Sequence, residues 1–87
     1  MEEYVYLIRN GDLYNLGYSK NLEKTKENLT PGKLFAYLKT NSANSLCTRL
    51  QQKYLEERLP NTDYFRLNKS QLLECQLIMK NHGDKKW

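Results

Sequence analysis

Two apolar, tyrosine-rich runs stand on either side of an Asn-Gly pair near the start of the chain. The runs are Tyr4–Ile8 and Asp12–Gly17, and the pair between them is Asn10-Gly11. Asn-Gly is the typical central pair of a type I′ turn, because both central residues of that turn need positive φ. We therefore predict a β-hairpin over residues 3–18, with Tyr6 and Asn15 opposite each other on its two strands.

The other elements follow from apolar periodicity and from capping residues. Asn21 suits the N-cap of a helix over 22–29, and Asn68 with Gln71 resembles a capping box before the last helix. The remaining predicted elements are a strand over 33–39, a helix over 42–58, a short strand or extended segment over 64–67 and a helix over 69–81. The order ββαβαβα predicts an α+β domain with a small, mainly antiparallel three-stranded sheet packed with helices.

Size and composition allow one small domain. The chain has 87 residues, and we expect a single domain over 1–83 followed by a frayed tail over 84–87. Its formal charge of +4 permits binding to a polyanion without requiring it. No apolar run approaches the length of a membrane span, and the acidic start, Met-Glu-Glu, differs from a signal peptide. We therefore expect a cytoplasmic protein without membrane contact, in the host cytoplasm if a phage encodes it.

Cys47 and Cys75 fall on apolar positions of the predicted helices. Their spacing is not that of a metal-binding cysteine pair, so we expect two reduced, buried thiols. The last predicted helix carries more apolar residues than one narrow stripe requires. These are Leu72, Leu73, Cys75, Leu77, Ile78 and Met79. Such a helix is either well buried or shares its surplus apolar surface with another chain, and the sequence leaves a homodimer open.

Four segments, in order, resemble the GIY-YIG nuclease superfamily. They are Tyr4–Ile8, Leu13–Gly17, Ser19–Lys24 and Pro60–Leu67. The most similar branch is the small, single-domain one of bacteriophages and large DNA viruses. The resemblance covers about residues 3–67 and implies the fold of this family, whose members cut phosphodiester bonds. In that family a tyrosine activates water, an arginine stabilises the phosphate charge, a histidine supports the tyrosine, and a glutamate holds one divalent metal.

Only part of that machinery is present at the matching positions. The first-motif tyrosine corresponds to Tyr6. The second-motif tyrosine falls on Asn15, the arginine on Thr25, the histidine on Gln51 and the glutamate on Asp63. Thr25 has no charge, and Gln51 does not take up a proton near neutral pH. The carboxylate of Asp63 either binds Mg²⁺ or caps the local turn. The resemblance thus implies the fold with degenerate catalytic motifs, so we expect no enzyme, and no cofactor unless Mg²⁺ serves a surviving activity.

The substrate class of the family and the mild positive charge favour nucleic-acid binding, with DNA as the expected ligand. The predicted binding residues are Tyr6, Asn15, Lys20, Lys24, Lys39 and Arg49. Several strand tyrosines form either an aromatic shelf for stacked bases or ordinary half-buried strand positions. They are Tyr4, Tyr6, Tyr14, Tyr18 and Tyr37. Two alternatives stay open: a protein-interaction module that binds and redirects a host or partner protein, and a residual metal-dependent endonuclease.

Overall fold

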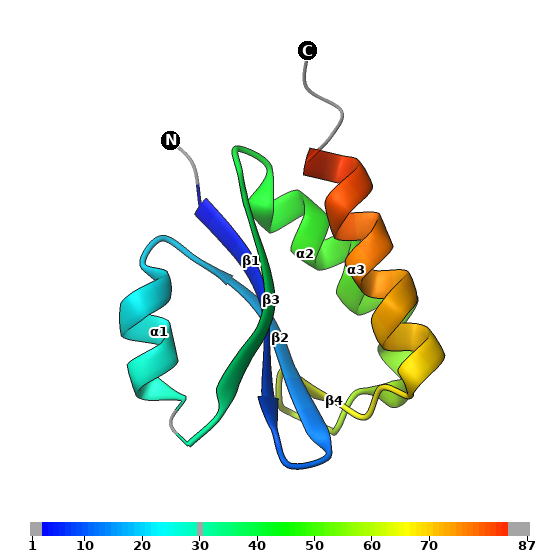
Figure 1. The fold of residues 1–87 in the computed structure, drawn as a ribbon. Helices are drawn as coiled ribbons and strands as arrows, with labels where there is room; N and C mark the ends of the chain where they lie inside the picture. Colours follow the sequence, from blue (N-terminus) through cyan, green and yellow to red (C-terminus); the bar gives the residue numbers. More distant parts are fainter. Residues whose placement is uncertain (1–2, 30, 84–87) are drawn as a thin grey trace.

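A computed structural model describes the protein over residues 3–29 and 31–83. The predicted tail over 84–87 lies outside the described residues. The elements along the chain are β1 (Glu3–Asn10), β2 (Leu13–Ser19), α1 (Leu22–Asn28), β3 (Lys33–Thr40), α2 (Ala43–Lys53), the 3₁₀ helix η1 (Leu55–Glu57), β4 (Tyr64–Phe65) and α3 (Lys69–Gly83) (Figure 1). Within the described ranges, no helix is both long and apolar enough to cross a membrane.

Four antiparallel strands form one sheet, in the spatial order β3-β1-β2-β4. The prediction of an α+β domain is confirmed, and the prediction of a three-stranded sheet is wrong. The fourth strand is β4, which has 2 residues and pairs with β2 through Tyr14–Phe65 and Asn15–Tyr64. Phe65 is fully buried. Burial of one aromatic ring therefore holds a strand that is too short to show a period-two pattern in the sequence.

The predicted element order also lacks the 3₁₀ helix η1. The helix predicted over 42–58 ends at Lys53, and a single tighter turn follows it over Leu55–Glu57. In this turn the amide of Glu57 donates to the carbonyl of Tyr54 at 2.9 Å. Hydrogen bonds from an amide to the carbonyl three residues earlier satisfy carbonyls that lack partners at the end of an α-helix. Here such a turn ends the helical segment before the loop to β4.

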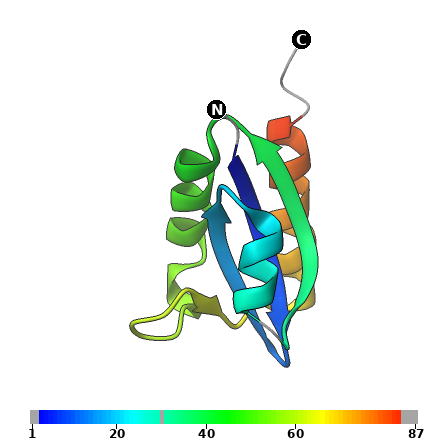
Figure 2. The same ribbon diagram turned by 90° about the vertical axis from the view of Figure 1, so that its left-hand side faces the viewer.

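Helices cover both faces of the sheet, but unequally (Figure 1 and Figure 2). α2 and α3 pack together on one face and enclose the core, whereas α1 lies over the other face. α1 has 7 residues, and none of them is buried. The predicted N-cap of α1 is confirmed, because the side chain of Asn21 accepts a hydrogen bond from the amide of Lys24 at 3.0 Å. The buried core consists of Val5, Leu7, Tyr14, Leu16, Ala43, Leu46, Cys47, Leu50, Tyr54, Phe65, Leu67, Leu72, Cys75 and Met79.

The β1–β2 hairpin turns one residue later than predicted. Asn10 pairs with Leu13, so the two turn residues are Gly11 and Asp12 rather than Asn10 and Gly11. Gly11 has a φ of 65°, and the only described non-glycine residue with positive φ is Asn61. Positive φ at the first central residue alone is the pattern of a type II′ turn, in which glycine takes that place. The predicted type I′ turn is therefore wrong.

The predicted capping box of the last helix is confirmed. The amide of Asn68 donates to the side chain of Gln71 at 2.9 Å, and the amide of Gln71 donates to the side chain of Asn68 at 2.8 Å. These two bonds satisfy two main-chain donors that would otherwise lack partners at the helix start. α3 then continues past the predicted 69–81 to Gly83.

Both cysteines are unpaired and buried in the core, as predicted. Cys47 is 3% exposed and Cys75 is fully buried. Burial raises the pKa of the Cys47 thiol from 9.0 to about 11, and the negative charge of Asp63 adds to this effect. Burial, with a smaller effect of Glu74, raises the pKa of the Cys75 thiol to about 12. Both thiols therefore stay protonated and unreactive at neutral pH.

The raised thiol pKa values predict a loss of stability in alkaline solution. In the unfolded chain a thiol ionises near pH 9.0, whereas the fold keeps Cys47 protonated up to about pH 11. The contribution is complete below the unfolded pKa and is lost as pH rises through the folded pKa. Each such thiol adds a slope of about 1.4 kcal/mol per pH unit in that window.

Urea denaturation of the wild type and of Cys47→Ala, in reducing buffer from neutral pH to about pH 11, measures this slope. We expect the free energy of unfolding to fall less steeply with pH in the variant. Equal slopes would contradict the assignment of the effect to the Cys47 thiol. The comparison uses slopes, because removing the buried sulfur also lowers stability at every pH.

Candidate nucleic-acid interface

The three predicted binding residues that belong to strands, Tyr6, Asn15 and Lys39, lie on one face of the sheet. Paired residues on neighbouring strands share a face, since successive side chains alternate along each strand. We call this surface the α1-side face. Its three cross-strand rows are Lys39–Tyr4–Ser19, Tyr37–Tyr6–Gly17 and Leu34–Ile8–Asn15. α1 lies over this face, as the view from that side shows (Figure 2).

Tyr6 lies against the main chain of Gly17. The two residues are paired across β1 and β2, and a Cβ atom placed on Gly17 would lie 2.6 Å from the phenolic oxygen of Tyr6. Tyr6 is 8% exposed. Burial, followed by the negative charge of Asp63, raises the pKa of its phenol above the usual value. The ring therefore presents a neutral hydroxyl at physiological pH.

Asn15 is not opposite Tyr6, as the predicted turn required. The type II′ turn moves the pairing by two residues, so that Asn15 faces Ile8 and Tyr6 faces Gly17. A shift of two residues leaves every side chain on its predicted face, and Tyr6 and Asn15 remain neighbours on the α1-side face. Asn15 is 8% exposed and also pairs with Tyr64 of β4. Only a small part of its amide is therefore accessible to a ligand.

Gln51 and Asp63 meet at the outer edge of β2. The side-chain amide of Gln51, on α2, donates to the carbonyl of Leu16 at 2.7 Å and to Asp63 at 3.4 Å. The amide of Leu16 donates in turn to the main-chain carbonyl of Asp63 at 3.0 Å. Gln51 is thus engaged in holding α2 and the loop before β4 to the sheet.

The carboxylate of Asp63 lies beside a cationic side chain. Its carboxylate lies 4.0 Å from the guanidinium of Arg58, which compensates the negative charge. Among the described residues, no group of three or more His, Cys, Asp or Glu is placed to hold a metal ion. The alternative role as cap of the turn falls to Thr62, whose hydroxyl accepts from the amide of Tyr64 at 3.1 Å and donates to the carbonyl of Leu59 at 2.9 Å.

Thr25 uses its hydroxyl within the protein. It donates to the hydroxyl of Ser19 at 2.7 Å and lies 3.1 Å from the carbonyl of Asn21. Thr25 thereby links α1 to the end of β2. Other residues of β2 make similar contacts. Gly17 lies against Tyr6, and Leu16 forms hydrogen bonds with Gln51 and Asp63. Ser19 bonds to Thr25, and Asn15 belongs to the same strand. The segment Asn15–Ser19 therefore contacts or contains all the positions that the sequence marked as catalytic remnants.

An aromatic and cationic cluster lies at the end of the α1-side face. The rings of Tyr4 and Tyr37 are 6.0 Å apart, and the ammonium of Lys39 lies 5.9 Å from the centre of the Tyr4 ring. Tyr37 is 56% exposed. Lys20 directly follows Ser19, which pairs with Tyr4, and Lys24 lies in the first turn of α1; both lysines are exposed. Lys39 thus lies with two tyrosines at this end of the face, and Lys20 and Lys24 lie in the segment that follows β2.

Arg49 lies away from this cluster. It is exposed on α2, which packs on the opposite face of the sheet. Gln51, two residues later, points toward β2. Because an α-helix turns about 100° per residue, Arg49 projects about 200° away from Gln51 around the helix axis. The predicted binding set is therefore divided between two sides of the protein, and Arg49 is the residue that does not join the others.

The predicted aromatic shelf is also divided between the two faces. Tyr14 and Tyr18 point to the core side, since they pair with Arg9 and Val5 of β1. Tyr14 is buried and packs edge-on against Phe35 at 5.4 Å. Of the five tyrosines in the predicted shelf, Tyr4, Tyr6 and Tyr37 share the α1-side face.

Sequence reasoning did not single out Gly17 and Ser19 as site residues. A glycine inside a strand signals a close approach of another group, so Gly17 was detectable in principle. The role of Ser19 depends on where α1 docks, and no local pattern indicates it.

Comparison with known proteins gives no match. No protein-family model matches the chain, and neither a curated protein nor a solved structure is significantly similar to it. The function proposed below therefore depends on the geometry of the α1-side face and on the ordered segments in the sequence.

The approach of Tyr6 to Gly17 predicts a strong coupling between the two positions. Gly17→Ala places a methyl group where the phenol lies, so we expect a loss of about 1–3 kcal/mol in the free energy of unfolding. In a Tyr6→Leu background the shorter side chain vacates that space, and the same Gly17→Ala change should cost much less.

Urea denaturation of the wild type, the two single variants and the double variant measures this coupling as a double-mutant cycle. Additive losses would show that the ring of Tyr6 does not limit the space at Gly17.

Proposed function

We propose that the protein is a catalytically degenerate GIY-YIG-like domain that binds nucleic acid, with DNA as the expected ligand, through its α1-side face. The four ordered sequence segments support membership of that superfamily. The contacts of Asn15–Ser19 add to this support, because they bring together the positions that match the family's catalytic residues.

The observation that carries the binding proposal is the exposed ring of Tyr37 beside the Tyr4–Lys39 pair. Tyr37 is 56% exposed, so much of its ring is accessible to a stacking partner. A base stacked on a tyrosine gains about 1–3 kcal/mol, and the neighbouring lysines attract the phosphate chain. Lys39 lies over the ring of Tyr4, and the exposed Lys20 and Lys24 follow the end of β2.

The chemistry of the positions that match the family's catalytic residues favours binding of nucleic acid over its cleavage. The raised pKa of Tyr6 opposes the phenolate that would accept a proton from water. Stabilisation of the charge on a phosphate requires a cation at position 25. Thr25 has only a hydroxyl there, and this hydroxyl already donates to Ser19. The side chain of Gln51 does not titrate, and the negative charge of Asp63 is compensated by Arg58. Charge stabilisation and proton transfer are therefore both weakened, while the stacking surface is retained.

The lysines and tyrosines of the α1-side face predict the effects of three single substitutions on binding of a labelled DNA oligonucleotide. Tyr37→Ala should weaken binding by about 1–3 kcal/mol through lost stacking. Lys24→Ala should lower the slope of log K against log salt by about 1, since one phosphate contact is lost. Arg49→Ala is the matched control on the other side of the sheet and should change neither quantity. Fluorescence anisotropy over a salt series measures all three.

Two outcomes oppose this proposal. If neither DNA nor RNA binds at low salt, or if Arg49→Ala weakens binding as much as Lys24→Ala, the α1-side face is not the binding surface. Cleavage of plasmid DNA in Mg²⁺ or Mn²⁺ that disappears in Tyr6→Phe would instead identify a residual endonuclease.

The second candidate function is a protein-interaction module that uses α3. Leu73 and Leu77 are 56% and 58% exposed, and their spacing of four residues places them side by side on the helix surface. Two adjacent exposed leucines form a small apolar patch, and its burial against a partner would be favourable. The surplus apolar surface predicted for this helix is therefore present on its outer side.

Substitution of both leucines tests this second function. The double change Leu73→Gln and Leu77→Gln should leave the free energy of unfolding within about 0.5 kcal/mol, because both side chains are largely exposed. It should abolish stoichiometric capture of a protein partner in a nuclease-treated pull-down, and any self-association in sedimentation. Leu55→Gln, at a leucine that is 51% exposed on η1, is the control. Unchanged capture and self-association would remove this surface from consideration.

A further inference from the structure

β3 is an edge strand with an open side. It stands at one end of the sheet order, paired with β1, and no other described strand pairs with its outer side. It has 8 residues, Lys33–Thr40, and is therefore much longer than β4 at the opposite edge. The outer side of such a strand presents main-chain amides and carbonyls that can pair with another strand.

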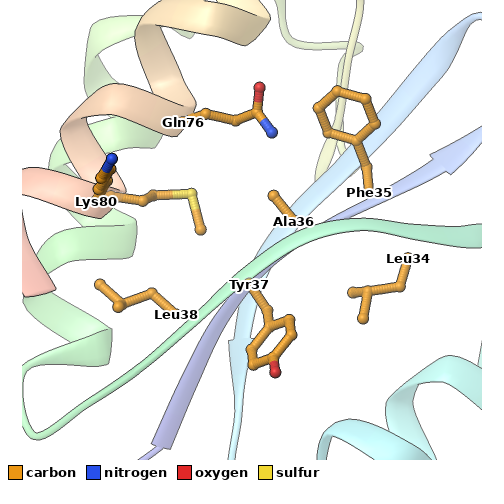
Figure 3. A pocket seen from close by; sticks show the side chains of 8 residues that line it. Leu34, Phe35, Ala36, Tyr37, Leu38, Gln76 and Lys80 are labelled. Carbon is orange, nitrogen blue, oxygen red and sulfur yellow. The ribbon is translucent and has the colours of Figure 1, made fainter.

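A groove follows this edge between β3 and α3. Its volume is about 650 Å³. It is lined by Leu34, Phe35, Ala36, Tyr37, Leu38, Gln76, Met79 and Lys80 (Figure 3). The side chains of Phe35, Ala36 and Leu38 point toward α3, whereas those of Tyr37 and Leu34 point away from it. Residues of both orientations line the groove, so the main chain of β3 forms part of its wall.

The dimensions of the groove fit an extended peptide. Five consecutive residues of β3 line it, and at about 3.3 Å per residue they span roughly 17 Å. A strand added along this edge would form main-chain hydrogen bonds with β3. Alternate side chains of that strand would enter the space beside Ala36 and Met79.

The charges around the groove indicate the chemistry of its occupant. Lys80 lines the groove together with Leu38, and Lys33 is the first residue of β3, where it pairs with Arg9. The lining residues include no acidic side chain. Cations at both ends and an apolar centre complement a peptide with acidic ends and an apolar middle.

The same charges disfavour a second copy of β3 in this position. β3 carries Lys33 and Lys39 near its two ends and has no acidic residue. An antiparallel copy centred on Ala36 would place each of these lysines opposite a lysine of its partner. Like charges that face each other directly across strands are destabilising, and lysines on edge strands oppose self-pairing.

We infer that the outer edge of β3 binds an extended peptide segment with an apolar centre and acidic ends, which joins the sheet as an additional strand. This function goes beyond the proposed nucleic-acid binding, because it takes a different ligand and uses α3; Tyr37 lies on the α1-side face and also lines the groove. The peptide contacts the main chain of β3 together with Lys80 and Gln76 of α3.

The test uses a synthetic peptide as long as β3, with alternating valine and threonine and a glutamate at each end. Titration followed by NMR should show shifts confined to Leu34–Leu38 and the facing residues of α3, with slowed hydrogen exchange of β3 amides. A peptide with methylated backbone nitrogens should bind at least about tenfold more weakly, because it cannot pair as a strand. Lys80→Glu should weaken binding of the acidic peptide and strengthen binding of a lysine-ended peptide, whereas Arg49→Glu should do neither.

Several results would overturn the inference. They are the absence of shifts along β3, equal binding of the methylated peptide, and equal effects of Lys80→Glu and Arg49→Glu. Protection of β3 amides that grows with protein concentration without peptide would show that a second copy fills the edge. Displacement of the peptide by DNA in the Lys24→Ala variant, with DNA shifts along β3, would assign the groove to nucleic acid. A lower salt dependence of DNA binding in Lys24→Ala, with peptide binding unchanged, separates the two functions.

Discussion

The close pairing of Tyr6 with Gly17 is the contact on which the arrangement of the α1-side face depends. It requires that Gly11 and Asp12 form the hairpin turn, because only that turn brings Gly17 opposite Tyr6. It also requires a residue without a side chain at position 17, since a Cβ atom there would lie 2.6 Å from the phenol. The neighbouring pairs then place Tyr37 beside Tyr6, and Tyr4 between Lys39 and Ser19.

The polar residues near β2 are largely engaged with one another. Gln51 bonds to Leu16, Thr25 bonds to Ser19, and Asp63 lies beside Arg58. Buried or partly buried polar groups need such partners, and each bond also ties a helix or loop to the sheet. Groups committed in this way stabilise the fold. Tyr37 is 56% exposed, and Lys20 and Lys24 are also exposed, so these side chains are accessible to a ligand.

The two edges of the sheet are protected to different degrees. β4 and the loop before it cover part of the outer edge of β2 and satisfy Leu16. The outer edge of β3 has no such cover among the described strands, and lysines near both of its ends oppose pairing with an identical strand.

Local sequence patterns were sufficient for the class of fold and for several element ends. The Asn21 cap, the box of Asn68 and Gln71 and the positions of both buried thiols follow from side-chain chemistry within a few residues. Periodicity also assigned Tyr6 and Asn15 to the same face correctly, because a register shift of two residues preserves faces. These features depend on residues that are close together in the chain, so the sequence alone is sufficient to predict them.

Only the tertiary structure decided the register, the fourth strand and the membership of the site. The turn at Gly11 and Asp12 competes with an equally plausible turn one residue earlier, and long-range pairing with Gly17 makes the choice. β4 has 2 residues and exists because Phe65 reaches the core. Whether Arg49 and Tyr14 face the lysines depends on which side of the sheet each element packs. Such relations join residues far apart in the chain, so no local pattern contains them.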